Sequence, residues 1–355
     1  MKKIKQKLTA LLILGTFFSN ISFSKNIKIV EDAAKNKVEV EKKIDKIGIT
    51  PMPWASVVYA IDDGSSEKIV TMNPSSMKAY KGNFLEKLDS DFGKIDTKIV
   101  GQNFVINLEE LIKLEPQVML IWDNQKDEAE KLKALGIAPI MVKNKTIEEL
   151  QASMKAVGEI LGKEIRANEF IELYSKTYQK IKSYENEVKK AKKPKVLYLR
   201  DSKLSFAQGS DNFIRETLEM AGADNIAGKS ISMEEIVATN PDIILLSNFD
   251  PFTPEDLYNN KIKGQDWSQI KAVKEKRVYK TPIGIYRWDA PGVETPLMME
   301  WLAKVIQPEI FKNIKFNSDL KKYFKNYFNY ELTDSDVAQI LNHEANKNSK
   351  KINLE

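Results

Sequence analysis

The stretch "NLEELIKLEPQVMLIW", residues 107–122, decides the fold, because the chain repeats it as "SMEEIVATNPDIILLS" at residues 232–247. In both copies a Glu–Glu pair opens a helical turn, a proline stops the helix, and an apolar run of strand length follows. The copies lie 125 residues apart (232 minus 107). A period this long indicates two similar lobes rather than a solenoid of short repeats.

Outside the repeat, short apolar runs alternate with longer amphipathic segments. This alternation predicts α/β architecture: two Rossmann-like lobes with parallel sheets covered by helices, and a ligand cleft between the lobes. We expect strands at residues 46–50, 68–73, 118–122, 139–143, 195–200, 242–247 and 277–282.

Residues 163–193 separate the two lobes. Their apolar side chains recur at helical spacing, and no proline interrupts them before Pro194. We therefore predict one long linking helix of roughly 40 Å at 1.5 Å per residue. Such a stiff connection permits small hinge or twist motions rather than wide closure of the lobes.

The N-terminus has the pattern of a secretory signal peptide. Residues 1–7 carry four lysines and no acid, residues 8–18 are an apolar run, and small or polar residues follow. We expect a leader at 1–24 and a soluble, exported mature protein. The other expected segments are an N-terminal extension at 25–44, lobes at 45–162 and 194–332 on either side of the linking helix, and a polar C-terminal tail at 333–355.

Cysteine and histidine usage excludes several kinds of site. There is no cysteine, so we expect no disulfide, no lipid-anchoring lipobox and no thiolate metal site. The single histidine, His343, excludes sites that need several imidazoles, and a Ser-His-Asp triad would require His343 to fold back into the cleft. The net charge of +5 falls to about +1 without the four leader lysines, so no nucleic-acid partner is indicated.

The segments that follow the strands should line the cleft, because ligands of open α/β sheets bind at the carboxyl ends of the strands. Most large side chains there have an alternative as core packing, and Arg287 has an alternative as a solvated surface charge. Burying Arg287 without a partner would be costly, whereas an anionic ligand could pair with it through two hydrogen bonds. The candidate ligand-binding residues are Trp54, Tyr59, Tyr80, Trp122, Phe206, Tyr286, Arg287 and Trp288.

A metal could reach this cleft in two ways. Tyr286 or Tyr80 could hold ferric iron directly through the phenol oxygen. Alternatively, the metal arrives already wrapped in a chelator, which large aromatic side chains and arginine would suit. The residues alone leave both possibilities open.

Taken together, these features resemble class III periplasmic substrate-binding proteins, which serve ABC importers of ferric siderophores, haem, cobalamin and related metal compounds. The first repeat copy is similar to the family segment N-x-E-x-L-x-x-L-x-P-D-L-V, with Gln117 in place of the usual Asp. The stretch "GIYRWDAPGVETPLMMEWLAKVIQPEIF" (284–311) is similar to iron- and metal-chelate-binding members. The resemblance covers roughly residues 45–330.

The resemblance implies a role for one glutamate in each lobe, Glu109 and Glu234, which would pair with arginines on the two subunits of a permease in the inner membrane. Their alternative is to be helix N-terminal acids favoured by the helix dipole. The implied function is capture of an iron compound, first a ferric siderophore, by a monomeric periplasmic protein without a tightly bound cofactor. Haem, a corrinoid, nickel or molybdate are alternative cargoes. An α/β hydrolase is the alternative from another class, and the sequence lacks its GxSxG motif.

Overall fold

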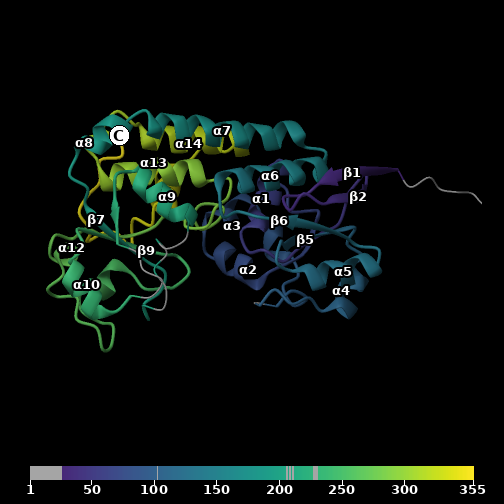
Figure 1. The fold of residues 1–355 in the computed structure, drawn as a ribbon, viewed down its shortest axis with the longest axis horizontal. Helices are drawn as coiled ribbons and strands as arrows, with labels where there is room; N and C mark the ends of the chain where they lie inside the picture. The colour runs from purple at the N-terminus through teal and green to yellow at the C-terminus, as the bar shows by residue number, and fades with distance from the viewer. Residues whose placement is uncertain (1–25, 102, 205–206, 208, 210–211, 227–230) are drawn as a thin grey trace, which may run out of the picture.

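The computed structural model describes residues 26–101, 103–204, 207, 209, 212–226 and 231–355. Two α/β lobes lie side by side beneath a long helix that runs along both of them (Figure 1). The two-lobed α/β architecture is therefore confirmed. The predicted leader at 1–24 and the candidate Phe206 lie outside the described residues.

The N-terminal lobe is built on a four-stranded parallel sheet in the order β4–β3–β5–β6. Its strands are apolar and mostly buried on both faces, as expected for a parallel sheet covered by helices. All four agree with predicted strands: β3 (Ile47–Ile49), β4 (Ile69–Met72), β5 (Val118–Trp122) and β6 (Ala138–Val142).

Helices cover this sheet on both sides. In Figure 1, α1 and α6 lie on the side of the long upper helix, whereas α4 and α5 lie at the lower edge. The helical segments of the lobe are α1 (Trp54–Ile61), α2 (Pro74–Tyr80), α3 (Phe84–Leu88), η1 (Asp91–Lys94), α4 (Leu108–Leu114), α5 (Lys126–Ala134) and α6 (Ile147–Leu161).

The C-terminal lobe repeats this topology. Its parallel sheet has the order β10–β9–β7–β8, so both sheets read 2-1-3-4 when their strands are numbered along the chain. The strands are β7 (Lys195–Leu199), β8 (Asp224–Asn225), β9 (Ile243–Leu246) and β10 (Val278–Lys280). The helices are α9 (Asn212–Met220), α10 (Met233–Thr239), α11 (Pro254–Tyr258), α12 (Lys271–Lys274) and α13 (Thr295–Ile306).

The sequence repeat corresponds to α4–β5 in one lobe and α10–β9 in the other. Each helix begins with a capping side chain: Asn107 accepts a hydrogen bond from the third residue of its helix, and Ser232 does the same. Each helix ends at a residue with left-handed backbone, Glu115 (φ 53°) and Asn240 (φ 48°). The two copies are therefore equivalent down to their caps.

Gln117, which departs from the family pattern, keeps the hydrogen bond of its counterpart. Its Oε1 accepts from the Lys46 amide at 3.2 Å, just before the first strand of its lobe. In the other lobe Asp242 Oδ2 accepts from the Lys195 amide at 2.8 Å in the equivalent place. The replacement therefore preserves the link between the helix-to-strand turn and the neighbouring strand.

The linking helix is shorter than the predicted 163–193. Helix α7 (Glu164–Lys182) is followed by a turn and a short helix, α8 (Glu185–Lys190). At the turn, Ser183 Oγ donates to the Lys180 carbonyl at 2.7 Å, a local bond that competes with the helical pattern. Tyr184 then packs on Phe311 of the C-terminal lobe, with ring centroids 5.0 Å apart.

The N-terminal extension forms an antiparallel hairpin of β1 (Ile27–Glu31) and β2 (Lys37–Glu41). Its turn lies against the last strand of the N-terminal sheet, where the Ala33 amide donates to the Met141 carbonyl at 3.1 Å. The hairpin thus covers part of a sheet edge that would otherwise expose unpaired backbone groups.

The predicted polar tail is wrong as a description of residues 333–355. After α14 (Phe316–Phe328), the chain forms α15 (Asp334–Ile340), and Ile340 and Leu341 are buried. We call residues 316–342 the C-terminal arm, because this segment also packs on the N-terminal lobe. Phe324 meets Phe84 edge-on at 5.0 Å. Within the described part of the chain, no helix is both long and apolar enough to cross a membrane.

Candidate functional site

The site begins where strands β7 and β9 end, since the strand order of the C-terminal sheet reverses between them. Arg200 directly follows β7, and Asn248 and Phe249 follow β9. The guanidinium carbon of Arg200 lies 4.0 Å from the centroid of the Phe249 ring, and that of Arg287 lies 4.7 Å from it. Two cationic side chains therefore share one aromatic ring at this edge of the sheet.

Arg287 reaches from the C-terminal lobe to the N-terminal lobe. Its Nε donates to the Asn248 carbonyl at 2.9 Å, and its Nη1 donates to the Tyr286 hydroxyl at 3.1 Å and to the Ser75 carbonyl at 3.3 Å. Ser75 lies in the first turn of α2, on the opposite side of the cleft. Arg287 is only 7 % exposed, and these three acceptors are neutral.

The loop that carries Arg287 is held from inside by Glu294. The Tyr286 amide donates to Glu294 Oε2 at 3.0 Å, and the carboxyl also interacts with the Trp288 indole. Burial raises the pKa of Glu294 to about 7, although the hydrogen bond from the Tyr286 amide opposes the shift. A side chain at Gly284 would collide with this carboxylate, which explains the glycine there.

A buried lysine supports the neighbouring loop. Lys280 Nζ donates to the carbonyls of Ser247, Asp250 and Phe252 at 2.6, 2.6 and 2.9 Å. Burial lowers the pKa of Lys280 to about 8. Asp289 accepts from the Ser247 hydroxyl and from the backbone amide that follows it. The loop after β9 is therefore fixed before any ligand arrives.

At the strand ends of the N-terminal lobe, Gln125 joins two neighbouring strands through neutral groups. Gln125 Oε1 accepts from the Thr50 hydroxyl at 2.7 Å and from the Trp122 amide at 2.9 Å, between the ends of β3 and β5. The half-buried Trp122 ring lies edge-on to Phe104 at 6.5 Å. Of the predicted N-terminal residues, Trp122 is the one the structure leaves partly open at a strand end.

Three other predicted aromatics lie in the core of the N-terminal lobe. Trp54 and Tyr59 are buried on α1, and Tyr59 stacks on Phe328 of the C-terminal arm at 6.0 Å. Tyr80 stacks on Phe92 at 5.3 Å. In this arrangement the three rings brace α1 and α2 rather than present a surface to the cleft.

Tyr286 and Trp288 flank Arg287 but are themselves buried. Tyr286 clusters with Ala79 and Met52 of the N-terminal lobe, so it packs at the contact between the lobes. Trp288 packs on Phe316 at 6.2 Å. Of the three neighbours in this loop, Arg287 alone brings a charge to the contact between the lobes.

Direct ligation of iron by tyrosine finds no support in the local chemistry. Burial raises the pKa values of Tyr286 and Tyr80, which keeps both phenols protonated. Among the described residues, no group of three or more His, Cys, Asp or Glu side chains could hold a metal ion.

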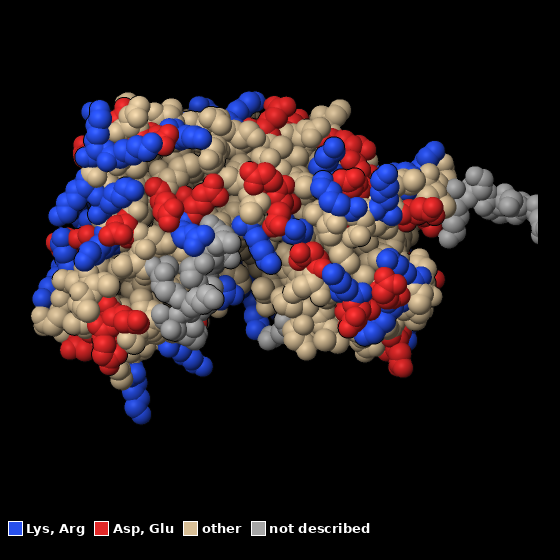
Figure 2. Space-filling view, viewed as in Figure 1, with Lys and Arg blue, Asp and Glu red and all other residues tan. Residues whose placement is uncertain are grey.

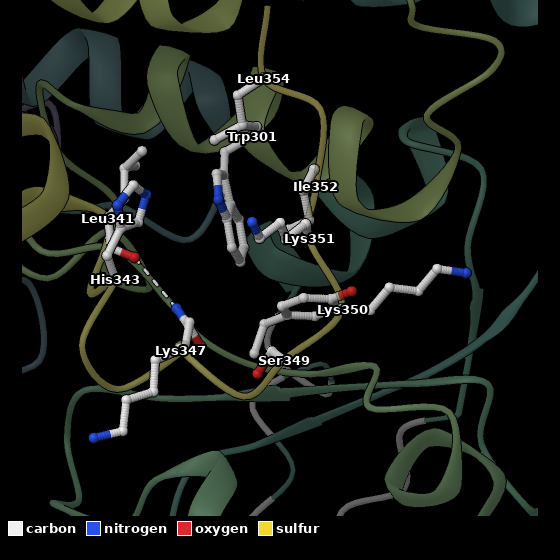
Figure 3. Close-up of a pocket in the computed structure, with 11 residues that line it drawn as sticks. Trp301, Leu341, His343, Lys347, Ser349, Lys350, Lys351, Ile352 and Leu354 are labelled. Carbon is white, nitrogen blue, oxygen red and sulfur yellow. Dashed lines mark hydrogen bonds between the residues drawn. The ribbon is translucent and has the colours of Figure 1, made fainter.

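His343 does fold back, but not into the cleft. It lines a cavity of about 420 Å³ at the outer end of the C-terminal lobe, together with Trp301 and Lys351 (Figure 3). Burial lowers the pKa of His343. No Asp or Glu side chain is among the residues that line this cavity, so it does not reproduce a Ser-His-Asp triad.

Sequence reasoning missed Arg200, Asn248 and the Ser75 carbonyl. Arg200 closes the predicted strand "KVLYLR", so its position at a strand end was visible. Its proximity to Arg287 depends on the strand order, because β7 and β10 are separated by β9.

The two predicted docking glutamates, Glu109 and Glu234, are exposed in the first turns of α4 and α10. Neither forms an ion pair with another described residue. In Figure 1 the two helices lie at the lower parts of the two lobes, on the side away from α7. Figure 2 shows the lobes parting on that side into a notch bordered by basic side chains.

Comparisons with known proteins agree with this geometry. The family model described as periplasmic binding protein matches residues 55–283. A crystal structure of a periplasmic solute binding protein from Veillonella parvula is similar, with a TM-score of 0.85 and 42% identity, covering 91% of this chain and 99% of that one. Helicobacter pylori CeuE with Ni(II) bound has a TM-score of 0.70 and 26% identity, covering 88% and 99%. The molybdate-binding protein MolA of Haemophilus influenzae is 21% identical, over 92% of this chain and 99% of that protein.

Proposed function

Because this chain belongs to the periplasmic binding protein family, we propose that it captures an anionic metal compound between its lobes and delivers it to the permease of an ABC importer. The observation that carries the proposal is the pair of guanidinium groups, Arg200 and Arg287, over the ring of Phe249. The family and the neighbours named above are solute-binding proteins, and the proposal includes no chemical step.

The two arginines favour an anion for an electrostatic reason. Both guanidinium groups lie against the ring of Phe249, so an anion bound near this ring would be attracted by both of them. Guanidinium groups also present paired N–H donors that match carboxylate, catecholate and oxyanion oxygens. The three neutral acceptors of Arg287 position the side chain without neutralising it.

A negatively charged ferric chelate, such as a carboxylate or catecholate siderophore, is the first candidate cargo. Its apolar parts would pack on the rings of Phe249 and Trp122, both half-buried near strand ends. Haem would also bring carboxylates, but the protonated Tyr286 is a poor axial ligand. A corrinoid or a bare nickel cation gains least from two arginines.

A compact metal oxyanion such as molybdate is the second candidate, and one observation favours it. Arg287 is nearly buried between the lobes, where Tyr286 packs on Ala79, so a compact oxyanion would disturb this contact less than a bulky chelate would. The similarity to MolA over almost the whole chain points in the same direction.

We place the mature protein in the periplasm as a monomer, after removal of the leader. Delivery would use Glu109 and Glu234, one on each lobe, each facing a basic side chain on one of two permease subunits. This arrangement is supported by the equivalent positions of the two glutamates in the repeated helices α4 and α10.

The test is a titration of purified residues 26–355 with each compound, in which the quenching of the intrinsic tryptophan fluorescence reports binding. The panel contains molybdate, anionic ferric siderophores, haem, cobalamin and Ni²⁺, with an uncharged ferric hydroxamate chelate as the matched control. We expect micromolar or tighter binding of an anionic compound and much weaker binding of the control. Failure of every metal compound to bind would refute the proposal, and preference for the uncharged chelate would refute the role of the arginines.

A further inference from the structure

The repeated helices share an exposed apolar side chain that the docking glutamates do not explain. Ile112 on α4 is 50 % exposed and Val237 on α10 is 52 % exposed. The two positions lie 125 residues apart (237 minus 112), which is the offset of the repeat. Single exposed apolar residues are common on protein surfaces, but here two occupy the same position of two equivalent helices.

Core packing does not account for these side chains. The preceding residues, Leu111 and Ile236, are fully buried and already supply the inward face of each helix. The following residues differ in the two copies, Lys113 in one and Ala238 in the other. The two helices therefore both carry a large apolar side chain at this exposed position, although they differ at the position that follows it.

Each apolar side chain lies one helical turn from a docking glutamate. Glu109 and Ile112 are three residues apart, as are Glu234 and Val237, so each pair shares a helix face. The second acid of each helix is already engaged: Glu110 pairs with Lys113 at 2.5 Å, and the other caps its own helix in a capping box. The first glutamate is thus left with the apolar side chain beside it.

We propose that Glu109 with Ile112, and Glu234 with Val237, form two matched docking patches, each combining a carboxylate with an apolar contact. Their occupant is a membrane partner with two equivalent subunits, each offering a basic side chain beside an apolar recess. This inference rests on the proposed delivery to a permease and adds the apolar half of the contact. It also explains why the patches are duplicated, because a two-fold partner presents the same surface twice.

The apolar half gives the patch its affinity. An exposed ion pair alone contributes little, because water screens both charges. An apolar side chain that enters a recess removes water from its surroundings and strengthens the neighbouring ion pair. A glutamate without its apolar neighbour would thus orient the protein on its partner but hold it weakly.

The experiment uses the importer that accepts the wild-type protein, reconstituted in proteoliposomes. The double variant Ile112→Ser with Val237→Ser is compared with Ile165→Ser. This control residue is 80 % exposed and belongs to α7, the helix that lies on the side of the molecule away from α4 and α10 (Figure 1). We expect the double variant to bind the importer about tenfold more weakly, as for loss of an interface anchor. Cargo affinity and the unfolding midpoint should not change, and the control should match wild type.

The outcomes separate this inference from the proposed function. Wild-type docking by the double serine variant, together with loss of docking by Glu109→Ala with Glu234→Ala, overturns the apolar contact and leaves permease delivery standing. Docking unaffected by either double variant overturns both patches. Equal weakening by Ile165→Ser overturns the inference too, because a general loss of surface hydrophobicity would then suffice.

Discussion

The two lobes have the same strand order but differ in what they bring to the cleft. The C-terminal lobe places Arg200 and Arg287 at its strand ends, whereas the N-terminal lobe offers the Thr50–Gln125 hydrogen bond and the edge of Trp122. The common topology therefore determines where the cleft lies, and the side chains of the C-terminal lobe determine the charge of the cleft. Equivalent backbones do not require equivalent roles.

A second difference lies in how the lobes are held. The C-terminal arm packs on the N-terminal lobe. Among the described residues, the N-terminal lobe has no equivalent segment that packs on the C-terminal lobe, apart from the linking helix α7. The Lys87–Asp336 ion pair at 2.5 Å and the contact of Phe324 with Phe84 join arm and lobe.

Phe324→Ala should break the mechanical tie between the lobes. The Phe324 side chain is fully buried against the rings of Phe84 in the N-terminal lobe and Tyr323 in the arm. Its removal should therefore cost about 3–5 kcal/mol of unfolding free energy. Urea unfolding followed by tryptophan fluorescence measures this loss, and we expect the transition to separate into two steps as the lobes uncouple. Ile165→Ala, at a side chain on α7 that is 80 % exposed, is the control. A single transition at the wild-type midpoint would contradict the role of the arm.

Glu294 should make the C-terminal loop sensitive to pH, whereas its N-terminal counterpart, held by the uncharged Gln125, should not respond. The folded pKa of about 7 lies above the usual 4.5, so the stabilising contribution is fully present below pH 4.5 and is lost as the pH rises through 7. This shift corresponds to about 3 kcal/mol. Glu294→Gln should flatten the difference in unfolding free energy between pH 5 and pH 8.

The control for that measurement is Glu110→Gln, at an exposed carboxylate on α4, which should leave the slope against pH as in wild type. If Glu294→Gln also leaves the slope unchanged, the carboxyl of Glu294 is not the group that titrates.

Arg287→Ala should reveal the charge asymmetry of the cleft. We expect the affinity for an anionic cargo to fall by about 2–3 kcal/mol, because the charge is nearly buried. Trp122→Ala on the other lobe should cost only about 1 kcal/mol, from lost ring contact. Isothermal titration measures both, with Arg287→Lys as an intermediate. Equal losses at the two positions would mean that the lobes contribute equally.

The smallest effect concerns the equivalent residues Gln117 and Asp242. Burial pushes the pKa of Asp242 up, but the Lys271 ammonium at 2.6 Å and the Lys195 amide hold it below its usual range. Asp242→Asn should therefore cost about 1 kcal/mol at pH 7. This contribution should vanish as the pH falls through the lowered pKa, while Gln117→Ala should show no such dependence. If the unfolding free energies of the two variants change in the same way as the pH falls, the proposed difference between Asp242 and Gln117 is contradicted.

The parallel strands other than β8 could be predicted, because they are short, continuous apolar runs bounded by helix signals. The strand β8 was missed, because its two residues, Asp224 and Asn225, are polar. The equivalence of the lobes was likewise visible in the repeat at 107–122. The pairing of Arg200 with Arg287 could not be predicted, because it depends on which strands are neighbours, and the strand order is not written in any local pattern.

Two errors had a signal in the sequence. Residues 54–61, "WASVVYAI", are apolar on every side, which is typical of a buried helix, so Trp54 and Tyr59 were better assigned to the core. The run "YFKNYF" at 323–328 has aromatic residues at helical spacing, which indicated a packed helix close to the supposed tail. The partner of that helix, α3 in the other lobe, could be found only in the structure.

The C-terminal arm has a consequence for kinetics. A pair of bodies joined at two separate places, here by α7 and by the arm, retains rotation about the line between the joints and little else. The hydrogen bond from Arg287 to the Ser75 carbonyl joins the lobes at their contact, so wide opening beside Arg287 would also have to break this bond. Uptake should consequently be a single bimolecular step without a slow closing phase, and escape of the solute should wait for an outside force that twists one lobe against the other.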